Sequence, residues 1–230
     1  PRDKMPSTRM GTAALIRETL VKTQNYLDKQ AKAAGDPDKD PPDEDLKLEA
    51  VALALRGEVQ ARIHAHRADD ILTALRLGEE FGLQVVVEHC TEGHKVAGEL
   101  AEAGVPALVG PTLGSRSKVE LRELSFATPG ELARAGVTVA LISDHPFVPV
   151  QYLPLCGGLA IREGLDEGTA LRAITLTPAE ILGVAGRVGS LEPGKDADLA
   201  IYQGHPFFDV QARCQLTMIR GQVVYDSGGS

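Results

Sequence analysis

The feature that most constrains the fold is a regular alternation of short apolar segments with amphipathic ones between residues 61 and 143. The apolar segments are rich in β-branched residues and predict four strands, at 61–66 (ARIHAH), 84–90 (QVVVEHC), 106–110 (PALVG) and 137–143 (VTVALIS). Helical patterns fall between them, at 69–81, 93–103 and 129–135. Strands that are almost wholly apolar are typical of parallel sheets. The alternation therefore predicts an α/β fold of βα units with right-handed crossovers.

Three polar side chains lie at the ends of these strands: His64, His89 and Asp144. Four βα units are too few to close an eight-stranded barrel, and a doubly wound open sheet would show the same alternation. An open sheet usually binds ligands near one switch point with a Gly-rich phosphate turn, and the sequence has no G-x-G-x-x-G or Walker motif. Because barrel enzymes place their chemistry at the carboxyl ends of several strands, the positions favour part of a barrel.

Two imidazoles and a carboxylate are suitable ligands for one divalent metal, for which zinc is the first choice. We expect His64, His89 and Asp144 to bind a metal that activates water, and Asp144 to carry a proton to the leaving nitrogen. Taken singly, each residue also fits a structural role, since strand histidines are commonly satisfied by hydrogen bonds and Asp144 could cap a helix. We interpret His66 and His94 as structural.

A barrel enzyme without a metal, such as an aldolase, is a weaker alternative. It would need a catalytic lysine at the end of a strand. The sequence places Lys95 and Lys118 in helix or loop segments instead.

The flanking segments predict helices and a separate β-element. Before the alternation we expect a loop up to Gly11, helices at 12–32 and 48–55, and an acidic, proline-containing surface loop at 35–45. After it we expect helices at 153–163, at 166–174 and from Pro178, with Thr177 as N-cap. Strands follow at 199–202, 216–219 and 223–225, the last two joined by a tight turn at Arg220 and Gly221. We expect two domains, 1–190 and 191–230.

The composition limits the partners. The formal net charge is −8 at pH 7, which disfavours nucleic acid and acidic membrane surfaces. No apolar run approaches the roughly 20 residues that a membrane span needs. The three cysteines are odd in number and widely spaced, so they predict neither a disulfide framework nor a zinc finger, and a cytoplasmic protein is the simplest interpretation.

The strand-end segments resemble a known family. ARIHAHRADDI, VVVEHC and ALISDHP resemble the fifth, sixth and eighth barrel strands of the metal-dependent amidohydrolase superfamily, in particular its imidazolonepropionase-like branch. ITLTPAEILGVAGRVGSLEPGKDADLAIY resembles the segment that leads into the companion β-sandwich domain, and IRGQVVYDSG resembles its closing strand pair. The resemblance covers most of the chain from about Arg56. It implies the C-terminal part of a TIM (β/α)8 barrel, about four βα units, with a small β-element of the companion domain.

The resemblance also implies roles for individual residues. His64 and His89 match the fifth- and sixth-strand metal ligands. Asp144 matches the eighth-strand aspartate, which in the family binds metal and is the catalytic acid and base. His145, the next residue, could polarise a carbonyl or orient the aspartate.

Arg67 departs from the family pattern. It stands where imidazolonepropionases carry an acidic residue that contacts substrate, and an arginine there would suit a carboxylate or another anion. The alternative is an ion pair with Asp69 or Asp70 at the start of the following helix.

A second departure concerns the first barrel strand, whose His-x-His pair binds the same metal in the family. The His-x-His of this sequence, His64 to His66, belongs to the fifth strand instead, so the resemblance implies that the first three or four strands lie outside the sequence. We therefore expect a metal-dependent hydrolase of C–N bonds in a small cyclic amide, N-acyl amino acid or dipeptide-like substrate, incomplete in this chain. The alternative is a non-catalytic half barrel that is stable only as a homo-oligomer or with a partner chain, because a half barrel exposes sheet edges.

Overall fold

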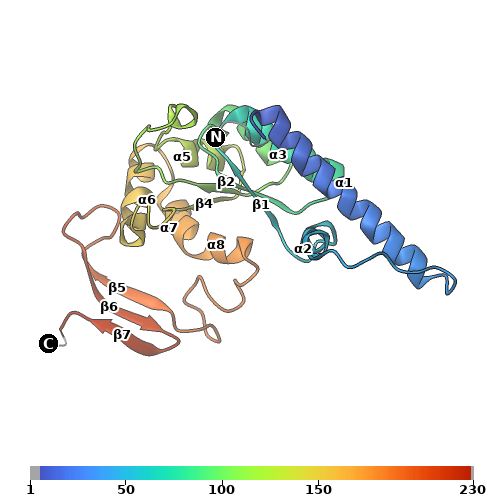
Figure 1. The fold of residues 1–230 in the computed structure, drawn as a ribbon. Helices are drawn as coiled ribbons and strands as arrows, with labels where there is room; N and C mark the ends of the chain where they lie inside the picture. The colour runs from blue at the N-terminus through green and yellow to red at the C-terminus, as the bar shows by residue number, and fades with distance from the viewer. Residues whose placement is uncertain (1–5, 229–230) are drawn as a thin grey trace. The chain divides into compact units, whose positions relative to one another are not determined.

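The structure is a computed structural model that describes residues 6–228. Contacts divide the chain into two compact units, one of residues up to Ile63 with Asp69–Val86, the other of His64–Ala68 with Val87 onward. Their extents differ from the expected domains 1–190 and 191–230, which stay a prediction. Figure 1 labels the helices and strands along the chain. None of the described helices is long and apolar enough to cross a membrane.

The first unit contains two helices that precede the sheet. Helix α1 is Arg9–Ala34 and helix α2 is Leu46–Leu55. The sequence predicted a loop up to Gly11, and this prediction is wrong from Arg9 onward. The helix begins earlier because the Thr8 hydroxyl caps it by accepting a hydrogen bond from the Gly11 N–H. Residues 1–5 of the expected loop lie outside the described residues.

Helix α3, Ala68–Phe81, is connected to α1 by ion pairs and by apolar packing. Arg17 of α1 donates to both carboxylate oxygens of Glu80, and Arg9 contacts Asp70. The apolar cluster of this unit consists of Leu20, Leu77 and Phe81, packed with Val51, Leu55 and Leu83. The helical spacing of these residues therefore serves to bury one face of each helix.

A four-stranded sheet carries the alternation seen in the sequence. Its strands are β1 (Ala61–Ala65), β2 (Val85–His89), β3 (Ala107–Val109) and β4 (Val139–Leu141), in the order β1-β2-β3-β4. The pairs β2–β3 and β3–β4 are parallel, and every residue of β3 and β4 is buried. The intervening segments are α3, then η1 (Gly93–Val96) with α4 (Ala97–Glu102), then η2 (Val119–Leu121) with α5 (Thr128–Arg134). The predicted α/β fold is confirmed; the described strands form part of a parallel sheet and do not test closure into an eight-stranded barrel.

Three helices follow β4: α6 (Leu153–Arg162), α7 (Glu167–Ile174) and α8 (Leu176–Ile181), with η3 (Val150–Tyr152) before them. Asp166 caps α7 by accepting a hydrogen bond from the Thr169 N–H. The expectation that Thr177 caps the next helix is wrong, since α8 already begins at Leu176 and Thr177 is buried within its first turn.

The last three strands form a separate antiparallel sheet, shown in red tones in Figure 1: β5 (Leu199–Gln203), β6 (Arg213–Ile219) and β7 (Gln222–Asp226). The tight turn between β6 and β7 is confirmed. Its central residues, Arg220 and Gly221, have φ values of 50° and 76°, which match a turn with two left-handed residues.

Phe207, in the loop before β6, anchors that loop on α6. Its buried ring packs with Ala160, Leu165 and Ala170, and its carbonyl oxygen lies against Gly158. A Cβ added at Gly158 would stand 2.0 Å from that oxygen. Glycine at this position is therefore required by the close approach of two backbones.

We predict that Gly158→Ala lowers the free energy of unfolding by roughly 1–3 kcal/mol, because the loop must move away from α6. Urea denaturation would measure it. The matched control is Gly98→Ala in α4, where a Cβ meets nothing within 4 Å and alanine should stabilise the helix by up to about 1 kcal/mol. Equal stability of the two variants would contradict the close contact.

Candidate functional site

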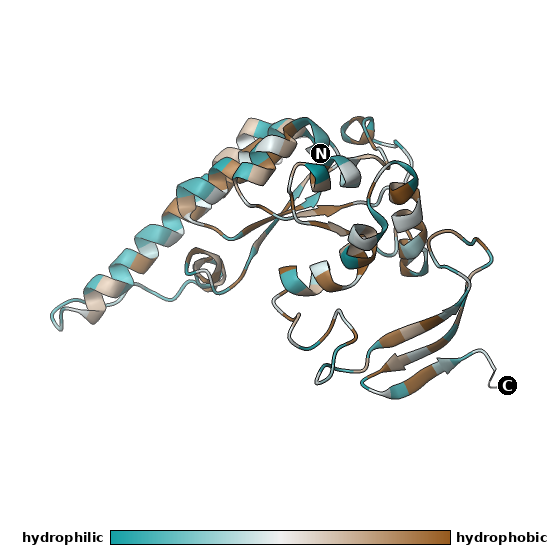
Figure 2. Cartoon of the chain, turned by 180° about the vertical axis from the view of Figure 1, so that it is seen from behind, coloured by the Kyte–Doolittle hydropathy of each residue, from teal (hydrophilic) through white to brown (hydrophobic). Residues whose placement is uncertain are grey.

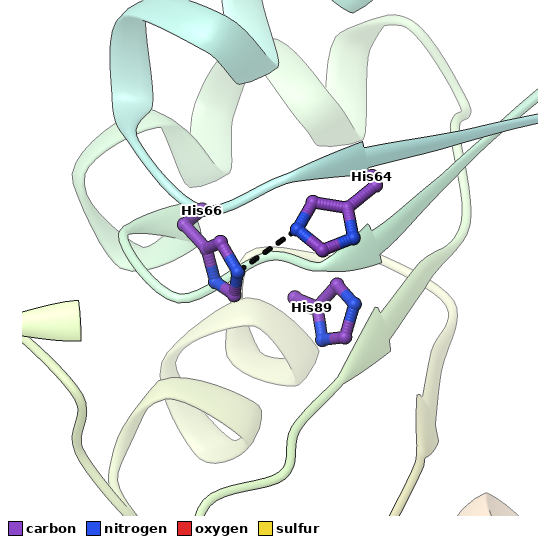
Figure 3. A group of neighbouring side chains, drawn as sticks. All are labelled: His64, His66 and His89. Atoms are coloured by element: carbon purple, nitrogen blue, oxygen red, sulfur yellow. Dashed lines mark hydrogen bonds between the residues drawn. The ribbon is translucent and has the colours of Figure 1, made fainter. Parts of the chain in front are cut away.

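Three histidines meet at the carboxyl ends of β1 and β2. His64 is the fourth residue of β1, His66 directly follows that strand, and His89 is the last residue of β2. Figure 3 shows the three rings turned toward one another. The ring centroids of His64 and His89 are 4.1 Å apart, and His66 lies 4.7 Å from each of them.

The ring nitrogens of this cluster converge. One nitrogen from each histidine lies within 4.8 Å of the others, and the Nε2 atoms of His64 and His66 are 3.0 Å apart. Zinc–nitrogen bonds of 2.0–2.1 Å at tetrahedral angles would place two ligand nitrogens about 3.3 Å apart. Small shifts of the rings would therefore bring all three nitrogens to coordination distance of one ion.

His89 is held by the backbone of the neighbouring strand end. Its Nδ1 lies 2.7 Å from the carbonyl oxygen of Gly110, just after β3. Because a carbonyl can only accept, Nδ1 carries the proton and Nε2 keeps its lone pair for a ligand. His66 has a comparable contact from its Nδ1 to the hydroxyl of Thr91, at 2.8 Å. Such contacts orient histidine ligands in metal sites.

The backbone is strained where the strands end. His89 and Asp144 have φ values of 69° and 50°, a left-handed conformation that side-chain-bearing residues seldom adopt. Gly110 has φ 138°, and a Cβ there would lie 2.2 Å from the carbonyl oxygen of Ile142. Strain of this kind persists where the surrounding structure enforces it and concentrates at functional sites.

The surroundings of His64 and His66 keep these two imidazoles uncharged. Desolvation, with further contributions from His89 and His64, lowers the pKa of His66 to about 4. Desolvation also lowers the pKa of His64, assisted by His89 and by the positive charge of Lys118. Both rings are therefore neutral at pH 7, which is the form that binds metal ions. The donor set of three imidazoles fits a borderline ion such as zinc.

Asp144 lines the same cavity as the three histidines. It follows β4 by three residues and is exposed, as is Phe147, which lines the same cavity. Its carboxylate is not among the ligand atoms that lie within 4.8 Å of one another in the described residues. The structure thus brings His64 and His89 together as expected and sets Asp144 beside them, while its coordination of the metal stays a prediction.

Neither His145 nor Arg67 is among the described residues that line the cavity. The Val150 N–H donates to His145 Nδ1 at 3.3 Å, which leaves Nε2 of that ring to donate. Burial alone would raise the pKa of Glu92, but hydrogen bonds from the Ala68 N–H and Lys95, together with the charges of Lys95 and Arg67, lower it. The charge of Arg67 therefore acts on Glu92, whose carboxylate accepts a hydrogen bond from Ala68, the first residue of α3.

His66 is the residue that the sequence interpretation missed, because it was read as structural together with His94. Residues two apart in a strand share a face, and this periodicity was the available signal for pairing His66 with His64. His94, by contrast, contacts the hydroxyl of Thr128 at 3.2 Å and lies outside the cluster.

We predict that His66→Ala weakens zinc binding by at least about 100-fold, since loss of an outer contact to a ligand already costs 10- to 100-fold. Competition with a chromophoric chelator would measure the affinity. His94→Ala is the matched control and should bind zinc as the parent chain does. Equal affinities of the two variants would show that His66 is not a ligand.

Comparison with known proteins agrees with this site. A solved structure of an amidohydrolase from Thermotoga maritima MSB8 is 44% identical, with a TM-score of 0.93 over 98% of this chain and 58% of that one. An imidazolonepropionase of Symbiobacterium thermophilum is 30% identical over 176 residues, which are 73% of this chain and 40% of that protein. The amidohydrolase tasK of Hapsidospora irregularis is 27% identical over 226 residues, 89% of this chain and 22% of that protein. The chain thus spans less than half the length of these curated relatives. Residues 10–225 match the model of the amidohydrolase family, and the chain therefore belongs to that family.

Proposed function

We propose that this chain carries the metal-binding and acid–base residues of a hydrolase that cleaves C–N bonds other than ordinary peptide bonds. The observation that supports it most is the convergence of His64, His66 and His89 in a cavity that Asp144 also lines. The similarity to an imidazolonepropionase and to two amidohydrolases supports the same class of reaction.

We propose zinc as the ion that the three histidines hold. Three protein ligands leave the fourth tetrahedral position open, as in catalytic zinc sites. A bound zinc ion would supply Lewis-acid chemistry, polarising a carbonyl and making water acidic enough to react at neutral pH. Nδ1 of His89 donates to the carbonyl oxygen of Gly110, so its Nε2 is available without a change of tautomer. The Thr91 hydroxyl can accept from Nδ1 of His66, which allows the same tautomer there.

Asp144 is the proposed acid and base. Its carboxylate takes a proton from the attacking water and returns it to the nitrogen that leaves when the C–N bond breaks. The short, left-handed turn after β4 brings it into the cavity.

The substrate is proposed to be a small amide: a cyclic amide, an N-acyl amino acid or a dipeptide-like compound. His145 would donate from Nε2 to the carbonyl oxygen, since Nδ1 is occupied by the Val150 N–H. A role of Arg67 in binding an anionic substrate also stays a proposal, as does its alternative, an ion pair with Asp69 or Asp70.

We predict that Asp144→Asn lowers the rate of amide hydrolysis at least about 100-fold, because an amide cannot accept the proton. Asparagine tolerates the left-handed backbone, so the fold and the zinc content should be preserved. Release of amine from a panel of N-acyl amino acids, cyclic amides and dipeptides measures the rate, and elemental analysis measures zinc.

The control is Asp40→Asn, which removes a carboxylate from the exposed acidic loop and should leave the rate unchanged. Unaltered turnover in Asp144→Asn would remove this residue from the mechanism. Loss of zinc along with activity would assign it a ligand role in place of the acid–base role.

As a second candidate, we propose that the chain is stabilised by association with itself. The sheet β5-β6-β7 supports this, because Ile201, Val223 and Val224 are 51%, 53% and 56% exposed. Figure 2 shows extensive hydrophobic colouring along these strands. The strand order leaves β5 and β7 as edges among the described residues, and exposed apolar edges favour pairing with another chain.

We predict a dimer or larger species in sedimentation equilibrium, and a shift toward monomer in Val224→Lys because a charge on the sheet opposes its burial. Val210→Lys is the matched control, since Val210 is 93% exposed in the loop before β6. A stable monomer at micromolar concentration would contradict self-association.

A further inference from the structure

The cavity beside the histidines contains a cation that the proposed reaction does not use. Lys118 lies on the loop between β3 and η2 and lines this cavity. Among the described residues that line it, Lys118 is the lysine or arginine side chain and Asp144 the carboxylate side chain. A substrate in this cavity would therefore meet opposite charges as well as the three imidazoles.

The ammonium group of Lys118 is available to a ligand. Its side chain is 65% exposed, and its distance of 3.9 Å from Glu120 is too long for a charge-assisted hydrogen bond. Lys118 thus lines the cavity of the three histidines, and its ammonium group, with three donors, can serve a ligand beside its ion pair with Glu120.

The remaining walls fit a compact organic ligand. Ser115 and Ser117 provide hydroxyl groups on the same loop as Lys118. Leu121, Leu124 and Phe147 provide apolar surface. Such a mixture, an apolar wall with a few polar groups, is typical of small-molecule sites in which the polar groups determine specificity.

We propose that Lys118 is a specificity-determining residue that binds the carboxylate of the substrate while the amide lies at the three histidines. This inference rests on the proposed function and selects, within its substrates, those with a free carboxylate. It gives Lys118 the role that the sequence suggested for Arg67, which lies outside the cavity lining and whose charge acts on Glu92.

Binding of a matched pair of probes tests the inference without relying on turnover. N-acetyl-L-leucine carries a carboxylate, and N-acetyl-L-leucine amide is its neutral counterpart. We expect the zinc-loaded chain to bind the carboxylate more tightly in NMR titrations. Lys118→Met should weaken that binding about 10- to 100-fold, the range for a charged hydrogen bond, and leave binding of the neutral amide unchanged.

Two further variants define the cause. Lys118→Arg keeps the charge and should retain most of the preference for the carboxylate. Lys22→Met is the matched control, because Lys22 is 63% exposed beside Glu18 on α1 and its loss changes the net charge equally. Its binding should match that of the parent chain.

The outcomes separate this inference from the proposed hydrolysis. If Lys118→Met weakens both probes equally, or if the parent chain binds neither probe or both alike, the inference is overturned, whatever the hydrolysis assay shows. If the carboxylate preference depends on Lys118 but no amide is hydrolysed, recognition by Lys118 stands and the proposed reaction fails.

Discussion

The site depends on one hydrogen bond, from Nδ1 of His89 to the carbonyl oxygen of Gly110, at 2.7 Å. The bond joins the carboxyl ends of β2 and β3, fixes the tautomer of the ring and directs Nε2 toward the other histidines. It requires an unusual backbone on both sides, with φ 69° at His89 and 138° at Gly110. Only glycine fits at the second position, because a Cβ would strike the carbonyl oxygen of Ile142 after β4. One contact therefore sets the relative positions of three strand ends.

A cluster of imidazoles has an electrostatic consequence. Three rings with centroids 4.1–4.7 Å apart bring their nitrogen lone pairs together in a partly desolvated place. A proton could relieve it, but desolvation and the adjacent rings hold the pKa of His66 at about 4. A divalent cation is a better partner, because one ion can accept all three lone pairs at once. The same desolvation that makes protonation unfavourable thus prepares the cluster for a metal.

The sequence predicted the strands well because β2, β3 and β4 are short, continuous apolar runs and β1 is separated from α3 by a clear change of pattern. It also predicted His64 and His89 at one cavity, since the carboxyl ends of neighbouring parallel strands share one edge of a sheet. It failed where the outcome depends on local geometry. His66 follows β1 by one residue, and whether its ring turns into the cluster depends on the hydrogen bond to Thr91, which is distant in sequence. The start of α1 was misplaced because the cap at Thr8 competes with equally plausible ones, and the start of α8 because no side-chain cap marks it.

Arg67 and Lys118 show why metal chemistry and substrate specificity are encoded differently. Arg67 follows His66 in the bend between β1 and α3 and is not among the described residues that line the cavity. Its charge is used at the start of α3, where Glu92 accepts a hydrogen bond from the Ala68 N–H. Lys118 comes instead from a loop, whose length and composition can change without disturbing the sheet. Strand ends therefore hold the metal ligands at fixed spacing, whereas the loop between β3 and η2 is free to carry the group that selects the substrate.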